Sequence, residues 1–113
     1  MARPKKCRKV CALPSHTAFM PRQGTCREQV VMSVDEYETI RLIDLEEMTQ
    51  EECARQMQIA RTTVQAIYIG ARKKLADCIV HGKMLLIEGG DVEVCPKGKS
   101  CCTQRGCCHR EEE

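Results

Sequence analysis

The chain has 113 residues, of which 10 are cysteine and 30% are charged. This length allows one domain with tails but not two independent cores. The longest plainly apolar stretch, Met84–Ile87, is far too short to cross a bilayer, and the basic start lacks the long apolar segment of a signal peptide. We therefore expect a cytoplasmic protein, whose reduced cysteines serve as buried thiols, redox groups or metal ligands rather than disulfides.

Charge is strongly segmented along the chain, although the net charge is only +2. Residues 1–27 carry seven Lys and Arg and no acid, whereas residues 28–52 carry nine acids and one base. Residues 53–83 return to six bases and one acid. Two basic segments that flank an acidic one indicate local surfaces for anionic partners, which the overall charge conceals.

The first 30 residues are rich in proline and show no sustained apolar period, which predicts a partly extended basic arm. A capping box follows, in which the side chain of Ser33 and that of Glu36 satisfy each other's backbone N–H groups. The apolar spacing after it predicts a helix of about three turns that ends near Leu45.

A second capping box, Thr49 with Glu52, predicts a short helix whose apolar side holds Cys53, Ala54 and Met57. Residues 58–60 then form a turn, and a long third helix follows. Its apolar stripe has a period close to 3.6 and consists of Val64, Ile67, Tyr68, Ala71, Leu75, Cys78 and Ile79. His81-Gly82 ends this helix, because glycine is the usual residue just past a helix.

Residues 83–88 have the composition of a short strand, closed by Gly89-Gly90. Such a strand needs a partner, and residues 8–13 are a candidate for it. Beyond Gly90 the chain has almost no large apolar residue, so we expect a tail that cannot fold alone.

A short helix, a tight turn and a longer basic helix form a helix-turn-helix pattern, which is typical of DNA-binding proteins. Any three-helix domain also has amphipathic helices, so this pattern alone is weak evidence. The face of the third helix opposite its apolar stripe holds Arg61, Thr62, Gln65, Ala66, Ile69 and Arg72. Arg pairs with guanine and Gln with adenine in the major groove. We expect Arg72, Lys73 and Lys74 to lie near phosphates, and the arm from Arg3 to Lys9 to add phosphate or minor-groove contacts. Our candidate DNA-binding residues are Gln50, Arg61, Thr62, Thr63, Gln65, Arg72 and Lys73, with Arg3, Lys5 and Lys6 of the arm.

The segments Thr49-Gln50-Glu51-Glu52-Cys53-Ala54, Arg61-Thr62-Thr63-Val64 and Ala71-Arg72-Lys73-Lys74-Leu75 resemble the fourth region of sigma factors. Together with Cys7-Arg8-Lys9-Val10-Cys11 and Ile87-Glu88-Gly89-Gly90, they are similar to a small uncharacterised prokaryotic family predicted to bind DNA. The resemblance covers roughly residues 1–90 and implies sequence-specific DNA binding and transcriptional regulation. Some relatives also carry a domain like those that handle the nitrogenase iron–molybdenum cofactor, which hints at metal biology.

Two residues depart from the pattern of that family. Gln58 occupies a turn position that is usually Gly, and Ala60 replaces the usual Ser that caps the third helix. Replacing Ser by Ala at a cap typically costs ~1 kcal/mol. Both changes weaken the expectation of tight DNA binding.

The ten cysteines fall into three groups. Cys53 and Cys78 lie on the inward faces of their helices and are expected to be buried thiols. Cys7, Cys11 and Cys26 lie on the basic arm, where the spacing is a weak signal for a metal. The tail offers five thiols and one imidazole, which suit zinc or an iron–sulfur cluster. These candidate ligands are Cys95, Cys101, Cys102, Cys107, Cys108 and His109, and a flexible thiol-rich tail, a redox pair or a soft-metal scavenger are alternatives.

The predicted fold is therefore mainly α. It comprises a basic arm (1–30), a three-helix helix-turn-helix domain with a short strand after its third helix (31–90) and a Cys-rich, flexible tail (91–113). We expect a DNA-binding transcriptional regulator, tuned by metal or redox state, that binds double-stranded DNA as a homodimer. The alternative is a metal or iron–sulfur protein whose helix-turn-helix is structural. The sequence shows no phosphate-binding loop and no nucleophile–base pair, so we expect no enzyme.

Overall fold

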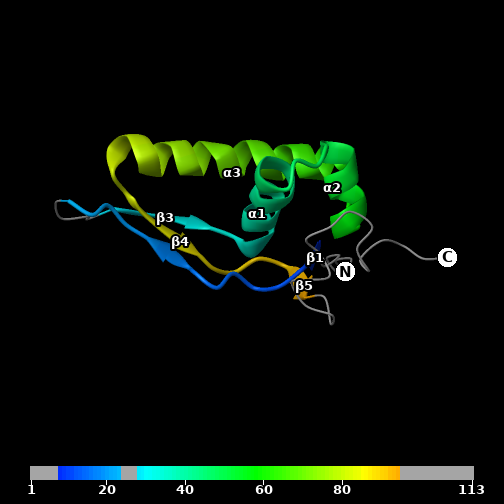
Figure 1. The fold of residues 1–113 in the computed structure, drawn as a ribbon, viewed down its shortest axis with the longest axis horizontal. Coiled ribbons are helices and arrows are strands. Elements are labelled where there is room, and N and C mark those ends of the chain that lie inside the picture. The colour runs from blue at the N-terminus through cyan, green and yellow to red at the C-terminus, as the bar shows by residue number, and fades with distance from the viewer. Residues whose placement is uncertain (1–7, 24–27, 95–113) are drawn as a thin grey trace, which may run out of the picture.

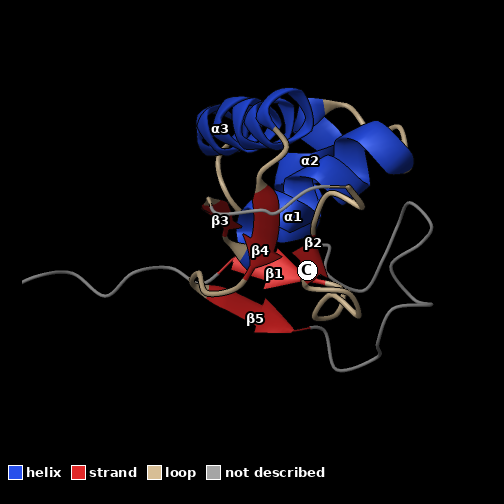
Figure 2. Ribbon diagram, turned by 90° about the vertical axis from the view of Figure 1, so that its left-hand side faces the viewer, coloured by secondary structure: helices blue, strands red, loops and turns tan. Residues whose placement is uncertain are grey.

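Three helices lie on one side of the strands, so the molecule has two layers (Figures 1 and 2). The computed structural model describes residues 8–23 and 28–94. The helices are α1 (Val34–Thr39), α2 (Gln50–Met57) and α3 (Arg61–His81), which confirms the three predicted helices. No helix in this part of the chain combines the length and the apolar character that a membrane span requires.

The helix α1 begins at the predicted capping box. Ser33 Oγ accepts the N–H of Glu36, and Glu36 Oε1 accepts the N–H of Ser33. Beyond Thr39 the helix continues as a π-helix, η1 (Ile40–Leu45). The predicted helix of three turns is therefore present as an α-helix followed directly by a π-helix. Within η1 the consecutive side chains of Arg41 and Leu42 are both buried.

The turn between α2 and α3 has the length that the sequence predicts. The second capping box is present, because Thr49 Oγ1 accepts the N–H of Glu52 and Glu52 Oε1 accepts that of Thr49. The helix α2 ends at Gln58, whose φ of 60° is left-handed. The helix α3 ends at Gly82, whose φ of 65° favours glycine.

The strands form two small sheets. The larger has the order β2-β4-β3, with β4 antiparallel to β2 and parallel to β3, and the smaller joins β1 to β5 in parallel. Their bounds are β1 (Arg8–Val10), β2 (Ala18–Phe19), β3 (Gln29–Met32), β4 (Met84–Ile87) and β5 (Val92–Val94). The strand predicted after the third helix is therefore present as β4.

The predicted partner of this strand is wrong, since residues 8–13 do not pair with residues 83–88. Both edges of β4 are occupied by β2 and β3. The strand β1 is instead held beneath α1, because Arg8 Nη1 lies 3.0 Å from Asp35 Oδ2. Gly90 allows β5 to return beside β1, because a Cβ at this residue would lie 2.7 Å from Asp35 Oδ1.

Buried apolar side chains form two clusters. One lies between α3 and the strands and contains Val10, Met32, Val34, Ala71, Cys78, Leu85 and Ile87. The other joins η1, α2 and the start of α3 through Leu42, Met48, Cys53, Ala54, Met57 and Val64. Of the predicted stripe of α3, four side chains belong to or pack against these clusters, namely Val64, Ala71, Leu75 and Cys78. Ile67 and Tyr68 are half-buried, and Ile79 is 79% exposed. The prediction that Ile79 is buried is wrong, because the sheet covers the side of the last turn that carries Cys78.

Candidate nucleic-acid interface

The position of α3 relative to α2 is fixed by the second cluster. Ala54 on α2 is small and 6% exposed, which permits the close approach of the two helices, and Val64 on α3 is fully buried. Ile59, in the turn, packs against the same cluster, and its N–H donates to the carbonyl of Ala54 at 3.1 Å. The start of α3 is therefore held in place by its contacts with α2, η1 and the turn before it.

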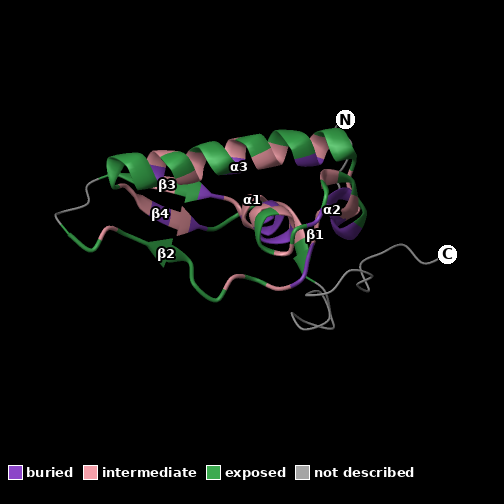
Figure 3. Ribbon diagram, turned by 45° about the horizontal axis from the view of Figure 1, so that its top comes forward, coloured by how far each residue is buried: buried purple, intermediate pink, exposed green. Residues whose placement is uncertain are grey.

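The outer face of α3, on the side away from this cluster, carries polar side chains that are exposed to solvent. Figure 3 shows that the side of α3 away from the other elements is exposed along its length. Most of the predicted DNA-binding residues of α3 lie on this face, namely Arg61, Thr62, Gln65, Arg72 and Lys73. Thr63, beside the buried Val64, is half-buried, as is Gln50 in the first turn of α2.

The N-terminus of α3 has no side-chain cap. Ala60 occupies the cap position with φ of −71° and ψ of 149°, and the first turn contains no acidic residue. The N–H of Thr63 donates instead to the carbonyl of Ala60 at 3.0 Å. This end of the helix therefore presents the positive end of its dipole beside Arg61, with no acidic residue in its own first turn.

Arg72 belongs to a cluster that the sequence does not predict as a whole. Its guanidinium lies over the ring of Tyr68, 5.3 Å from the centroid, and its Nε lies 3.9 Å from Asp44 Oδ2. The hydroxyl of Tyr68 donates to Asp44 Oδ1 at 2.7 Å, and this hydrogen bond raises the pKa of Tyr68. The spacing of Tyr68 and Arg72, four residues apart on a helix, is a signal for their contact, whereas nothing local indicates Asp44 on η1.

Some basic residues expected near phosphates have protein partners instead. We expected Lys74 to lie beside Arg72 and Lys73 on the DNA face, but its Nζ binds Glu36 Oε1 of α1 at 2.7 Å. In the arm, Arg8 binds Asp35, and Lys9 Nζ lies 2.7 Å from Glu93 Oε1 of β5. These three side chains therefore pair with carboxylates of the protein in the absence of DNA, and their role at phosphates stays a prediction. Arg3, Lys5 and Lys6 lie outside the described residues.

A buried ion pair behind the interface fixes η1. Glu38 is fully buried, and its two carboxylate oxygens accept hydrogen bonds from Nε and Nη2 of Arg41 at 3.1 and 3.0 Å. Glu38 Oε2 also accepts the N–H of Cys11 at 3.1 Å, and Arg41 Nη2 donates to Cys11 Sγ at 2.6 Å. This network joins the segment after β1 to α1 and η1, and it satisfies two charges that would otherwise be costly to bury.

The cysteines of the helices are structural. Cys53 and Cys78 are buried, as predicted. Burial raises the pKa of the Cys53 thiol to about 12, so this side chain stays protonated at neutral pH. Among residues 8–23 and 28–94, no group of three or more Cys, His, Asp or Glu side chains could hold a metal ion. The predicted tail ligands, Cys95, Cys101, Cys102, Cys107, Cys108 and His109, all lie outside the described residues.

Comparison with known proteins places the chain in a family. The family described as "Protein of unknown function DUF134" matches residues 1–95. A UPF0251 protein of Desulfitobacterium hafniense strain Y51 is 54% identical, with 99% of this chain and 98% of the relative covered. A UPF0251 protein of Caldicellulosiruptor saccharolyticus is 52% identical over 80% of this chain and 65% of its own length. No solved structure matches the chain. Because the family match covers residues 1–95 and the Desulfitobacterium relative aligns with 99% of the chain, the chain belongs to the DUF134 family.

Proposed function

We propose that this protein is a sequence-specific DNA-binding regulator, rather than an enzyme, in which α2 and α3 form a helix-turn-helix and α3 reads the major groove. The observation that carries this proposal is the exposure of Arg61, Thr62 and Gln65 in the first turns of a helix that Val64 anchors. Recognition helices of this class contact base edges with their N-terminal residues.

The chemistry of the exposed face suits base pairs. A Gln side chain can bond adenine through two atoms, and an Arg side chain can do the same with guanine. The exposed apolar side chains of Ala66 and Ile69 lie on the same face, and such groups can contact the methyl group of thymine. Gln65 and Arg61 are therefore the side chains assigned to direct readout.

Phosphates are assigned to the flanks of this face. Lys73 is exposed and lies about two helical turns after Gln65. The uncapped start of α3 offers backbone N–H groups to an anion. Arg72 is exposed to 63%, and its distance of 3.9 Å to Asp44 leaves it free to exchange this carboxylate for a phosphate. The stack on Tyr68 would keep the guanidinium in place during this exchange.

The experiment is selection of bound sequences from random double-stranded DNA, followed by titrations of the selected site. We expect that Gln65→Ala and Arg61→Ala lower the preference for that site by ~1–3 kcal/mol each, and that Lys73→Ala reduces the slope of log K against log salt by about 1. The control is Arg22→Ala, which removes an equal charge from an exposed residue beside β2.

Two results would contradict the proposal. One is a selection that enriches no sequence at low salt. The other is equal binding by the Arg61→Ala and Arg22→Ala variants, because the charge of the protein would then matter while the face of α3 would not.

Metal or redox tuning through the tail is a second proposal, which rests on the five thiols and one imidazole of residues 95–109. Metal analysis and absorption spectra of protein purified without oxygen test it, with a variant that carries Ser at the five tail cysteines as the comparison. Equal metal content in the two proteins, or identical DNA-binding curves with and without chelator and reductant, would refute it.

A further inference from the structure

An acidic side chain lies beside the face of α3 to which DNA contacts are assigned. Asp44, on η1, contacts Tyr68 and Arg72 of α3. These two residues follow Gln65 by three and seven positions, and residues at such spacings share one side of a helix. Gln65, Tyr68 and Arg72 therefore form one row along α3. A carboxylate next to this row repels the phosphates of DNA, so its presence on a DNA-binding face needs a reason.

The carboxylate of Asp44 is fixed by one neighbour and paired loosely with the other. Its Oδ1 accepts the hydroxyl of Tyr68 at 2.7 Å, which keeps the carboxylate from turning away. Its Oδ2 lies 3.9 Å from Nε of Arg72, beyond hydrogen-bond distance, so this contact is an ion pair alone. The side chains of Arg72 and Asp44 are 63% and 38% exposed. Ion pairs in such solvent-exposed positions contribute little to stability and separate readily.

Arg72 has a second contact that does not depend on Asp44. Its guanidinium lies over the ring of Tyr68, 5.3 Å from the centroid, and this cation–π contact persists when the carboxylate is replaced by another anion. Lys74, two residues further along α3, differs in this respect. Its Nζ lies 2.7 Å from Oε1 of Glu36, whose side chain is only 15% exposed, so this pair is short and well shielded. Arg72 is therefore better placed than Lys74 to exchange its partner.

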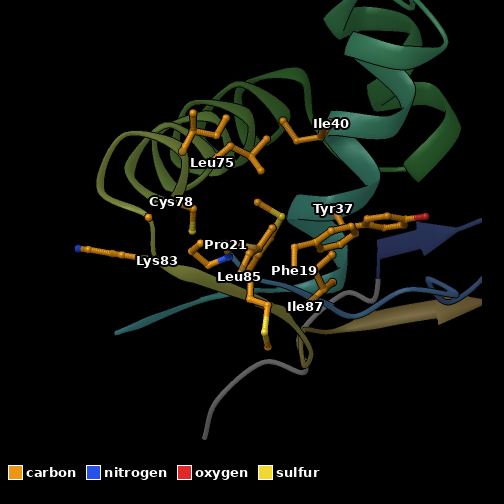
Figure 4. Close-up of a pocket in the computed structure, with 13 residues that line it drawn as sticks. Phe19, Pro21, Tyr37, Ile40, Leu75, Cys78, Lys83, Leu85 and Ile87 are labelled. Atoms are coloured by element: carbon orange, nitrogen blue, oxygen red, sulfur yellow. The ribbon is translucent and has the colours of Figure 1, made fainter. Parts of the chain in front are cut away.

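The second half of α3 has a different chemistry. Between it and the strands lies an apolar cavity of about 490 Å³ (Figure 4). Among the residues that line it, Lys83 alone is charged, and its Nζ lies 3.0 Å from Asp77 Oδ2. The helix carries no arginine after Arg72. The phosphate contacts assigned to α3 therefore end near Arg72 and Lys73.

We propose that Asp44 competes with the DNA backbone for Arg72 and thereby limits the affinity of the protein for DNA. In the free protein the guanidinium of Arg72 pairs with Asp44. On DNA a phosphate takes the exposed side of this guanidinium, while the carboxylate, fixed by Tyr68, stays close and repels the phosphate. The inference rests on the proposed function and deepens it. Because binding to random sequence depends on phosphate contacts, the competition acts there without any reading of bases.

Titration of a random-sequence DNA duplex with the full chain tests this competition. The variant is Asp44→Asn, because the amide oxygen still accepts the Tyr68 hydroxyl but carries no charge. We expect Asp44→Asn to bind the duplex roughly 3- to 10-fold more tightly than the wild type at low salt. The slope of log K against log salt should be steeper by up to about 0.9, since Arg72 then neutralises a phosphate without leaving a carboxylate unpaired. The two affinities should converge at high salt.

Two controls separate competition for Arg72 from the mere loss of a negative charge. Glu88→Gln removes the same charge from an exposed residue after β4 and should strengthen binding less. The double variant Asp44→Asn/Arg72→Gln is compared with Arg72→Gln alone. In that background the gain from Asp44→Asn should fall to the gain from Glu88→Gln, because no guanidinium is left to compete for. Circular dichroism verifies that all variants keep their helices.

Weaker binding by Asp44→Asn would overturn the proposal, because Asp44 would then orient Arg72 toward DNA. A gain no larger than that of Glu88→Gln, or one that persists in the Arg72→Gln background, would overturn it as well. The proposed function fails separately. If the wild type selects a DNA sequence but Asp44→Asn binds like Glu88→Gln, the competition is refuted and DNA reading stands. If Asp44→Asn gains affinity as expected but selection enriches no sequence, the competition stands and DNA reading is refuted.

Discussion

The start of α3 offers a direct test of how the helices are terminated. Ala60 already has the extended backbone of a cap residue, with φ of −71° and ψ of 149°, and it is exposed. A serine at this position can place its hydroxyl oxygen near the N–H groups of the first turn without any change in the backbone. We therefore expect Ala60→Ser to stabilise the protein.

The size of the effect follows from comparison with the other two helices. The third N–H of α1 donates to the Ser33 hydroxyl, and that of α2 donates to the Thr49 hydroxyl. At α3 the third N–H, that of Thr63, already has the carbonyl of Ala60 as a partner at 3.0 Å. The new hydroxyl thus improves a bond rather than rescuing a free donor, so the gain should lie in the lower half of the usual ~0.5–2 kcal/mol.

Urea unfolding followed by circular dichroism measures this change in the free energy of unfolding. A gain of about 0.5–1 kcal/mol corresponds to a rise in Tm of about 2–8 °C for a domain of this size. The matched control is Ala66→Ser, at an exposed position inside α3, where serine should destabilise by a few tenths of a kcal/mol. If Ala60→Ser destabilises the protein as much as the control does, a missing cap is not what limits the stability of α3.

Three further predictions concern residues with unusual surroundings. Glu38→Ala leaves the buried guanidinium of Arg41 without its carboxylate, so we expect a loss of about 3 kcal/mol in urea unfolding; a loss below 1 kcal/mol would show that the pair is not needed. Gln58→Gly removes the Cβ from a residue with φ of 60° and should stabilise the protein by ~1 kcal/mol, which a fall in Tm would contradict. Asp44→Asn removes the charge that accepts the hydroxyl of Tyr68, so the pKa of this phenol should fall toward 10 in an ultraviolet absorbance titration; an unchanged midpoint would mean that the hydrogen bond does not hold the proton.

The helices could be predicted because their signals are local. A capping box joins residues three positions apart, as at Ser33 and Thr49, and a glycine after the last turn acts on its neighbours alone, as at Gly82. The strands could not be paired in this way. The register of β4 with β2 and β3 depends on contacts between distant segments, and a run of four apolar residues carries no information about which of two partners it meets.

In the candidate interface, too, the local features could be predicted from the sequence and the contacts between distant segments could not. The exposure of Gln65 and Arg61 follows from the helical period, and the structure agrees with it. The pairing of Lys74 with Glu36 and of Arg72 with Asp44 depends on how α1 and η1 cross α3. A basic residue can be assigned to a helix from the sequence, but whether its charge faces solvent or a neighbouring carboxylate is a tertiary property.

The parallel pairing of β1 with β5 has a consequence for how the molecule folds and opens. Lys9 and Glu93, which face each other in this ladder, are 84 positions apart. Closing a loop of this length costs about 4 kcal/mol of chain entropy, whereas α2 and α3 form from neighbouring residues. Three residues a side give this ladder little to offset that cost, so it should form last, and β5, which is half-buried to exposed, should be the strand of the pair that opens first. Amide hydrogen exchange should then be faster in β5 than in β1, because Val10 of β1 is fully buried and stays anchored when the ladder opens.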